Sequence, residues 1–331
     1  MHPILIEIPT PWGELPIYSY GVMLGTSMIV AWYVVMWLGQ REGFHREVLA
    51  NTFIITAVSA IVGARLLYIL TNPNEFDSIP DLFALRRGGL VAYGGFLGGF
   101  VGALAYLKRK GVSFLGFADV TAPTLALGLA LTRIGCYLYG CDYGARLGED
   151  APDWLVTIGT FPHWADDAGS PAWSHHVADY GLASDAAHSF PVHPTQLYES
   201  LAGFTLLGAT LLMWRHRSFR GQVLLALAAL YGVWRYCIEY LRDDPERGQA
   251  FGFSTSQLIS LAIVPVAAFF YYQIRKQHLA SPASVMRLGA PETYAAIVPE
   301  GAPAPVTPAS EPEDEAAKKS GAVVKKKKPK R

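Results

Sequence analysis

Residues 49–71 read LANTFIITAVSAIVGARLLYILT, and Arg65 is the single charged residue among them. The hydrocarbon core of a bilayer is about 30 Å thick, and an α-helix that rises about 1.5 Å per residue needs about 20 apolar residues to cross it. This stretch is therefore long enough and apolar enough to span a membrane.

Six further blocks of this kind occur along the chain. Together the seven occupy residues 18–39, 49–71, 88–107, 117–139, 196–214, 221–241 and 255–273. One such block is compatible with a buried helix of a soluble protein, but seven in succession are not. The first block lacks the basic n-region and the small-residue cleavage site of a signal peptide. We therefore expect an all-α polytopic membrane protein with seven transmembrane helices.

The composition excludes several other classes of protein. Hydrophobic residues make up 51% of the 331 residues and charged residues 16%, whereas a globular chain averages about 25% charged residues. Disorder of the whole chain requires low hydrophobicity and high net charge, and the net charge here is zero. Three cysteines are too few for a secreted disulfide scaffold. Outside the last seven residues, KKKKPKR, no basic domain is present, so we expect no nucleic-acid partner.

The positions of Lys and Arg predict the orientation in the membrane. Loops 40–48, 108–116 and 215–220 together carry eight of these residues, and the loops on the other side carry five, spread over longer and more acidic segments. Short cytoplasmic loops are enriched in Lys and Arg. We therefore expect the N-terminus to be periplasmic and the C-terminus to be cytoplasmic, in a multi-pass protein of the bacterial inner membrane.

Two segments lie outside the helical bundle. Residues 1–279 are expected to form the membrane domain, which includes a small periplasmic cap at 140–195 that is rich in aromatic residues. Residues 280–331 are rich in Ala and Pro and then polybasic, a composition typical of a disordered tail. Such a cytoplasmic tail either stays solvated or contacts anionic membrane lipids.

Polar side chains gather at one predicted depth. An ionisable side chain inside a membrane is costly and usually faces the protein interior. The outer half contains Tyr18, Tyr20, Arg65, Tyr93, Arg133, His193, Gln196, Glu199, Arg235, Glu239 and Arg242. Arg242 and Glu199 lie near enough to helix ends to snorkel to the interface. Arg65, Arg133 and Arg235 are each followed by further apolar residues, which favours a shared polar cavity.

The chemistry of this cavity points to a phosphate. Tyr231, Arg235 and Glu239 are spaced i, i+4, i+8 and share one helical stripe, so Arg235 is able to pair with Glu239. Guanidinium groups match phosphate oxygens, and the phosphates at this depth belong to phospholipids. Arginines also stabilise the charge that develops on a leaving phosphate. We therefore expect chemistry on a phospholipid at the outer face. Asp119 lies at an inner helix end, where it is expected to cap helix 117–139.

Glycines recur at a spacing of four in the third apolar block. Gly94, Gly98 and Gly102 form one set, and Gly95 and Gly99 form another. This small-xxx-small pattern is typical of close helix packing in membranes. The alternative is a glycine-lined slot for an acyl chain beside Tyr93.

Several motifs in one order resemble those of a known family. They are the pair Tyr20–Gly21, the glycines between 88 and 99, TRIGCYLYGCDYG at 132–144, HPTQLYE at 193–199 and RYCIEYLR at 235–242. Together they resemble the prolipoprotein diacylglyceryl transferases. The resemblance implies an inner-membrane enzyme that transfers diacylglycerol from phosphatidylglycerol to the lipobox cysteine of an exported preprolipoprotein. Its products are a thioether and glycerol phosphate, and no metal or cofactor is implied.

The resemblance also implies roles for particular residues. Arg133 and Arg235 are the candidates for a phosphate clamp, and Glu239 is expected to orient Arg235. Substrate-binding positions are expected at Tyr20, Arg65, Gly94, Gly95, Gly140, Gly144, Gln196, Glu199, Tyr231 and Arg242. Gly140 and Gly144 are further expected to shape the turn after helix 117–139.

The sequence departs from the familiar family pattern in two places. Many members have a histidine where this chain has Tyr93, and a tyrosine with a pKa near about 10 is a poor base. The candidates for the base that deprotonates the thiol are therefore Tyr93, His193 and the phosphate of the substrate. Members often carry Asn and Glu where this chain has Cys136 and Cys141.

The two cysteines leave two alternatives open. On a continuous helix, residues five positions apart point about 140° apart, which disfavours a disulfide. A bridge is possible if the helix ends near Tyr139, and otherwise Cys136 and Cys141 are small buried hydrophobic residues. Cys237 is expected to be a packing residue. The histidines of the cap fit no common zinc spacing, so we expect no metal site.

Three other functions compete with the transferase. A transporter usually shows internal repeats and a binding site near the midplane, and neither is visible here. An intramembrane hydrolase needs a nucleophile with a base or a metal pair, and the chain has no HExxH motif. A catalytically inactive relative that binds lipid or lipoprotein is the third alternative, and binding without turnover is its mark.

Overall fold

The computed structural model describes residues 3–10, 13–73, 89–164, 169–243 and 249–280. Long helices within these ranges follow the seven apolar blocks closely. They are α1 (Ser19–Arg41), α2 (Arg46–Thr71), α3 (Ala92–Arg109), α4 (Phe114–Tyr139), α7 (Thr195–His216), α8 (Gln222–Ile238) and α9 (Thr255–Ala280). The predicted disorder of the tail concerns residues that lie, apart from Ala280, outside the described ranges.

Six of these helices are long and apolar enough to cross a membrane. They are α1, α2, α4, α7, α9 and the continuous segment Gln222–Leu241, which consists of α8 and the short 3₁₀ helix η4 (Glu239–Leu241). Helix α3 has 18 residues, and its glycines and the terminal pair Lys108 and Arg109 lower its mean hydropathy. The described helices therefore establish a mostly helical, multi-pass architecture.

A β-hairpin that the all-α prediction missed precedes α1. Strand β1 (Ile4–Thr10) pairs with β2 (Gly13–Tyr18) in antiparallel fashion. The pairs Ile6↔Ile17 and Ile8↔Leu15 place four apolar residues on one face. Apolar residues alternate at Ile4, Ile6 and Ile8, which is the period of a strand rather than of a helix. A second, two-residue pairing joins β3 (Gln249–Ala250) to β4 (Phe253–Ser254).

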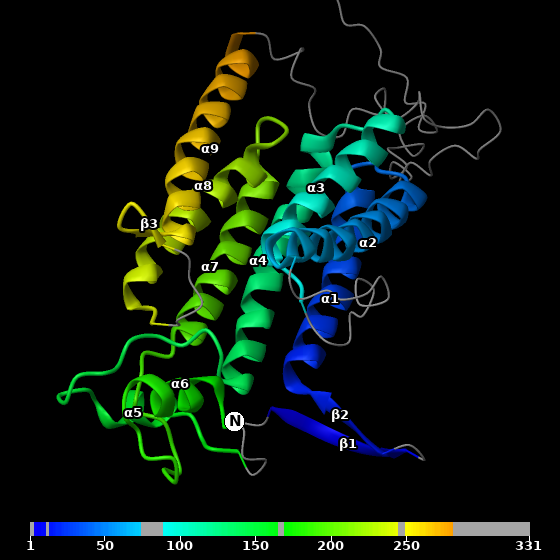
Figure 1. The fold of residues 1–331 in the computed structure, drawn as a ribbon. Coiled ribbons are helices and arrows are strands. Elements are labelled where there is room, and N and C mark those ends of the chain that lie inside the picture. The colour runs from blue at the N-terminus through cyan, green and yellow to red at the C-terminus, as the bar shows by residue number, and fades with distance from the viewer. Residues whose placement is uncertain (1–2, 11–12, 74–88, 165–168, 244–248, 281–331) are drawn as a thin grey trace, which may run out of the picture.

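Helix α4 runs through the centre of the bundle. It lies between α1 and α7 (Figure 1) and is the most deeply buried of the long helices. The Ser113 hydroxyl caps its N-terminus by accepting a hydrogen bond from the Gly116 amide at 3.3 Å. Gly140 ends it in the left-handed region, with φ 84°, a conformation that glycine adopts without a Cβ penalty. The two ends of this helix carry the main polar clusters of the protein.

At one end of α4, Asp119 has a different role from the one predicted. Its carboxylate accepts hydrogen bonds from the amides of Gly221, Val223 and Leu224 at 2.8–3.0 Å. Asp119 therefore caps the N-terminus of α8 and not that of α4, because the α7–α8 turn folds over it. Arg217 lies 3.8 Å from the same carboxylate. This contact ties the α7–α8 turn to the start of α4.

The glycines of α3 pack against α2. A Cβ on Gly94 or on Gly98 would collide with the backbone of α2 around Gly63. A Cβ on Gly95 would lie 3.5 Å from the Ala60 carbonyl oxygen. The small-residue stripe therefore lets the two backbones approach closely, which is the packing alternative of the prediction.

The described residues of the segment 140–195, which we call the cap, lie at the opposite end of α4. The cap contains α5 (Asp153–Ile158) and α6 (Pro171–Asp179). Four of its buried side chains form a small core, namely Tyr143, Phe161, Ala172 and Val192. The cap and the β1–β2 hairpin lie at the same end of the bundle (Figure 1). That end also holds the polar cluster described next.

Candidate functional site

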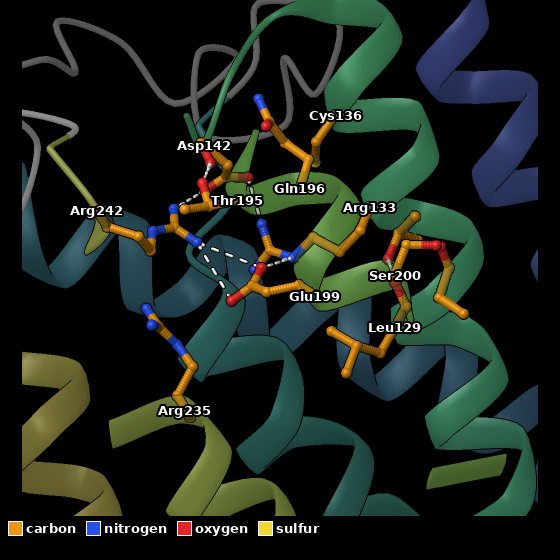
Figure 2. Close-up of polar contacts among 12 residues, drawn as sticks. Leu129, Arg133, Cys136, Asp142, Thr195, Gln196, Glu199, Ser200, Arg235 and Arg242 are labelled. Atoms are coloured by element: carbon orange, nitrogen blue, oxygen red, sulfur yellow. Dashed lines mark hydrogen bonds and ion pairs between the residues drawn. The ribbon is translucent and has the colours of Figure 1, made fainter. Parts of the chain in front are cut away.

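Two arginines and two carboxylates alternate in a closed arrangement where the cap meets the bundle (Figure 2). We call Arg133, Asp142, Arg242 and Glu199 the ion ring. Arg133 Nη1 lies 2.6 Å from Asp142 Oδ2, and its Nε contacts Glu199 Oε2. Arg242 contacts Asp142 Oδ1 through Nη2 and lies 3.4 Å from Glu199 through Nη1. Each charged group of the ring therefore has two partners of opposite charge.

Four segments bring these side chains together: α4 carries Arg133, the loop after it Asp142, α7 Glu199, and the end of η4 Arg242. Arg133 lies two turns before the end of α4, and Asp142 follows the Gly140 turn with φ 59°. A positive φ is uncommon outside glycine, although Asp tolerates it, and such backbone is often found at functional sites. The Thr195 hydroxyl, at the start of α7, donates to the Asp142 carbonyl oxygen at 2.7 Å. This contact holds Asp142 beside the first turns of α7, where Glu199 lies.

Three of the four side chains of the ion ring are largely shielded from solvent, and the Asp142 side chain is 29% exposed. The exposed fraction of the side chain is 0% for Glu199, 1% for Arg242 and 16% for Arg133. Snorkelling, the alternative considered for Arg242 and Glu199, is therefore wrong, because both side chains turn inward to ion-pair. Burial by itself raises the pKa of the Asp142 carboxyl, but Arg133 and Arg242 outweigh it and hold that pKa well below its usual range. Asp142 is ionised at any physiological pH.

A second ion pair lies at the end of α8, between Arg235 on α8 and Glu239 at the start of η4. Arg235 Nη1 donates to Glu239 Oε2 at 2.5 Å, which confirms the pairing expected from the i, i+4 spacing. Its Nη2 donates to the Ser256 hydroxyl at 2.8 Å, at the start of α9. Tyr231, one turn before Arg235, interacts electrostatically with Arg133, Glu199, Arg235 and Arg242. The predicted stripe of α8 therefore borders the ion ring.

Other predicted residues also border the ring. Gln196 Nε2 donates to the Cys141 carbonyl oxygen at 2.7 Å. Tyr20 packs over Gly135, and it interacts electrostatically with Arg133 and Asp142. A Cβ on Gly144 would meet the Leu241 carbonyl oxygen and, at 2.8 Å, the Cβ of His193. The glycine at 144 therefore allows the loop after α4 to pass beside the segment that leads to Arg242.

Some predicted residues have their described contacts elsewhere. Arg65 donates to the Gly89 carbonyl oxygen at 3.0 Å and stacks on Tyr68, next to the α2–α3 pair. Tyr93 is 45% exposed on α3. His193 Nδ1 lies 3.4 Å from the Tyr198 hydroxyl, in the loop that leads into α7. Gly94 and Gly95 contact α2, as described above.

Asp142 is the residue of the ring that the sequence reasoning did not single out. It was read as part of a family motif and not as a charge inside the site. The sequence does contain a signal for this role. Asp142 is the first acidic residue after an apolar helix whose last turns carry Arg133. Only the reversal of the chain at Gly140 shows that its carboxylate returns to Arg133. Ser256 was also missed, because its contact with Arg235 joins two different helices, α9 and α8.

Comparison with known proteins identifies the family of this chain. The sequence profile of the family described as Prolipoprotein diacylglyceryl transferase matches residues 3–273. The chain belongs to this family. The match runs from β1 into α9 and covers every residue of the ion ring and the Arg235–Glu239 pair. The resemblance inferred from the sequence motifs is thereby confirmed.

Three relatives of this transferase family illustrate the likeness. A phosphatidylglycerol–prolipoprotein diacylglyceryl transferase of Clostridium tetani is 31% identical over 281 residues, which is 84% of this chain and 100% of the relative. The protein named phosphatidylglycerol–prolipoprotein diacylglyceryl transferase 2 of Clostridium perfringens is 35% identical over 79% of this chain and 92% of its own length. A transferase of the same name from Bacillus mycoides is 27% identical over 83% of this chain and 94% of its own length.

Proposed function

We propose that this chain transfers the diacylglyceryl group of phosphatidylglycerol to the lipobox cysteine thiol of exported prolipoproteins. The products are a thioether-linked protein and glycerol phosphate, and no cofactor takes part. The observation that carries the proposal is the buried ion ring beside the Arg235–Glu239 pair, inside a chain that belongs to this transferase family. The substrate of the reaction is a phosphate ester, and arginines are the side chains best suited to bind the oxygens of its phosphate.

The proposal includes an orientation in the bacterial inner membrane. All seven long helices span it, the N-terminus and the cap are periplasmic, and the C-terminus is cytoplasmic. The Lys and Arg content of loops 40–48, 108–116 and 215–220 supports this orientation. The cap and the β1–β2 hairpin share one end of the bundle, and the ion ring lies there too, since Arg133 and Asp142 are at the C-terminal end of α4. In this orientation the site faces the periplasmic leaflet, where an exported lipobox cysteine arrives. Membrane lipids supply the donor by lateral diffusion.

The arginines retain donors for a phosphate. A guanidinium has five N–H donors. Among the described contacts, Arg133 uses its Nε and Nη1, and Arg235 uses its Nη1 and Nη2. The carboxylates fix the planes of the two guanidinium groups before substrate arrives, so little reorganisation is needed when negative charge grows on the leaving phosphate. Glu239 and Ser256 are positioning residues for Arg235.

The reaction also needs a proton acceptor. The thiol loses its proton, the sulfur attacks the glycerol carbon, and the bond from that carbon to the phosphate oxygen breaks with its electrons leaving on glycerol phosphate. Burial lowers the pKa of His193, so its imidazole is neutral at pH 7 and able to accept a proton. Tyr93 and the substrate phosphate are the other candidates. Full turnover in Tyr93→Phe would exclude Tyr93 from the proton transfer, and full turnover in His193→Gln would exclude His193.

A turnover assay on the purified protein tests the function. The protein is mixed with phosphatidylglycerol and a lipobox peptide, and the peptide is weighed by mass spectrometry. We expect a diacylglycerol-sized mass gain on the cysteine. Arg133→Lys and Arg235→Lys keep the charge but lose the bidentate geometry, and each is expected to lower turnover at least about 100-fold. Arg109→Lys, at the exposed end of α3, is the matched control and should keep full turnover.

Thermal unfolding of every variant accompanies this assay. A variant that is folded but inactive assigns its arginine to the reaction. If the folded wild-type chain binds phosphatidylglycerol but produces no mass gain, the chain is an inactive relative and the proposal is wrong. If turnover persists in both lysine variants, the transferase stands, but the phosphate clamp lies elsewhere.

A further inference from the structure

We propose that Cys136 and Cys141 are a disulfide-forming pair that braces the ion ring when the chain meets a thiol oxidant. In the structure both thiols are free. The inference rests on the proposed function only for the periplasmic location of the pair, since disulfides form and persist in that compartment.

The end of α4 brings the two cysteines together. The helix stops at Tyr139, and Gly140 takes the left-handed conformation. The Cys136 carbonyl oxygen then accepts hydrogen bonds from the Gly140 amide at 2.8 Å and from the Cys141 amide at 3.2 Å. Cys141 is thus folded back onto the last helical turn, and the 140° divergence of a continuous helix does not apply. The two sulfur atoms lie within 4.8 Å of each other.

The contacts of the two sulfur atoms are weak ones. Cys141 Sγ lies 3.9 Å from the Cys136 carbonyl oxygen and 3.9 Å from Asp142 Oδ2, and the Cys136 thiol interacts with the side chains of Cys141 and Asp142. A disulfide needs about 2.05 Å between sulfurs, so a modest change of side-chain torsions closes the gap. The backbone of this turn is already closed by the hydrogen bond from the Cys141 amide to the Cys136 carbonyl oxygen.

A disulfide fits this place better than a metal ion does. Cys136, Cys141 and Asp142 present three ligand atoms within 4.8 Å, which is also a possible donor set for a thiophilic cation. However, both oxygens of Asp142 are already paired with guanidinium groups, one of them Arg133 at 2.6 Å. A divalent cation would face two positive charges there, whereas a disulfide is neutral and displaces neither arginine.

The chemistry is a thiol–disulfide exchange with an external disulfide. Cys141 is half-buried and Cys136 is buried, so the Cys141 thiolate attacks the oxidant and forms a mixed disulfide. The Cys136 thiolate then displaces the second sulfur of the oxidant. The two cysteines lose two protons and two electrons, and the disulfide of the oxidant is reduced to two thiols.

The bridge acts on the residue next to it. Asp142 directly follows Cys141 and has a positive φ of 59°. Linking Cys141 to Cys136 fixes the backbone that holds Asp142 between Arg133 and Arg242. We therefore expect the oxidised protein to keep the ion ring in place at temperatures where the reduced protein loses it.

The test counts thiols in a Cys237→Ser background. Cys237 is exposed, so its removal takes away one thiol available for cross-linking between chains and leaves only the pair. The purified variant is incubated with glutathione disulfide, denatured in SDS and labelled with a maleimide. We expect no labelled thiol, a mass loss of about 2 Da for two hydrogens, and a monomer on a non-reducing gel. A phosphine reductant should restore both thiols.

Two outcomes would overturn the proposal. Either both thiols remain after treatment that fully oxidises a dithiol control peptide, or the bond that forms is between chains. In the same background, Cys136→Ser should stop at the mixed disulfide between Cys141 and glutathione, and Cys141→Ser should retain the buried Cys136 thiol for labelling. The thiol count does not depend on turnover, so a failed transferase assay and a failed disulfide are separate results. Reduction should lower the melting temperature of the active protein. Reduction should leave the melting temperature of the Cys141→Ser variant unchanged.

Discussion

Replacing Glu199 by Gln removes one negative charge from the ion ring while keeping the shape of the side chain. Glu199 is fully buried, and its carboxylate contacts Arg133 Nε and, at 3.4 Å, Arg242 Nη1. In the variant, two buried guanidinium groups share the single carboxylate of Asp142. Loss of one partner from a buried ion pair costs about 3–5 kcal/mol, because the remaining charge is left without compensation.

This loss is large enough to measure in detergent solution. At about 2 °C per kcal/mol, the low end that suits a chain of this length, the melting temperature should fall by roughly 6–10 °C. Tryptophan fluorescence is a suitable probe, since the chain contains 8 tryptophans. Glu14→Gln is the matched control, because Glu14 is exposed on the β1–β2 hairpin, and its effect should stay within about 0.5 kcal/mol.

A double-mutant cycle separates the charge effect from a simple packing defect. Arg133→Gln combined with Glu199→Gln removes both charges of one pair, so the surplus positive charge disappears. The double variant should be more stable than the sum of the single effects predicts, by about 1–3 kcal/mol. If Glu199→Gln melts within about 2 °C of the wild type, or if the two changes are additive, the ring does not stabilise the fold and the reasoning is refuted.

Three further predictions concern residues around the site. Gly144→Ala should cost about 1–3 kcal/mol because its Cβ meets Leu241 and His193, whereas Gly148→Ala, with nothing within 4 Å, should be silent in the same thermal melt. Asp119→Asn should lower the free energy of unfolding by about 2 kcal/mol, since the buried cap loses its charge and one of the two oxygens that accept from three amides; an unchanged melting temperature would contradict this role. His176 accepts a hydrogen bond from the Phe190 amide at Nδ1, and burial, followed by the nearby His175 and Arg146, lowers its pKa from 6.5 to about 4. The unfolded chain therefore takes up this proton first as the pH falls, and stability should drop by up to about 3 kcal/mol between pH 6.5 and pH 4, a slope that His176→Gln should lose.

The long helices follow from the sequence because their signal is local. A bilayer-length run of apolar residues predicts a helix without reference to the rest of the chain, and the block 117–139 agrees with α4 at its C-terminal end. The Arg235–Glu239 pair is also local, since a spacing of four places both side chains on one helical face. The family membership follows in the same way from short motifs in a fixed order.

The β1–β2 hairpin and the capping of the α8 N-terminus by Asp119 show where local signals are insufficient. Ile4, Ile6 and Ile8 alternate with the period of a strand, but a hairpin of this size is visible only once its partner strand is known. Asp119 was expected to cap the helix on which it lies. The structure places it against the amides of Gly221 and Val223, far away in the sequence.

The ion ring depends most on tertiary structure. The sequence alone supplies two arginines, a glutamate and an outer-leaflet depth, from which a phosphate-binding cavity is predicted. The sequence does not supply any of the four ion pairs of the ring, among them Arg133 with Asp142 and Arg242 with Glu199. These contacts arise because α4 ends at Tyr139 and the chain reverses at Gly140, which turns Asp142 back toward the helix. Such a reversal, and the rotation of α7 against α4, result from packing between distant segments, and no periodicity within one segment encodes them.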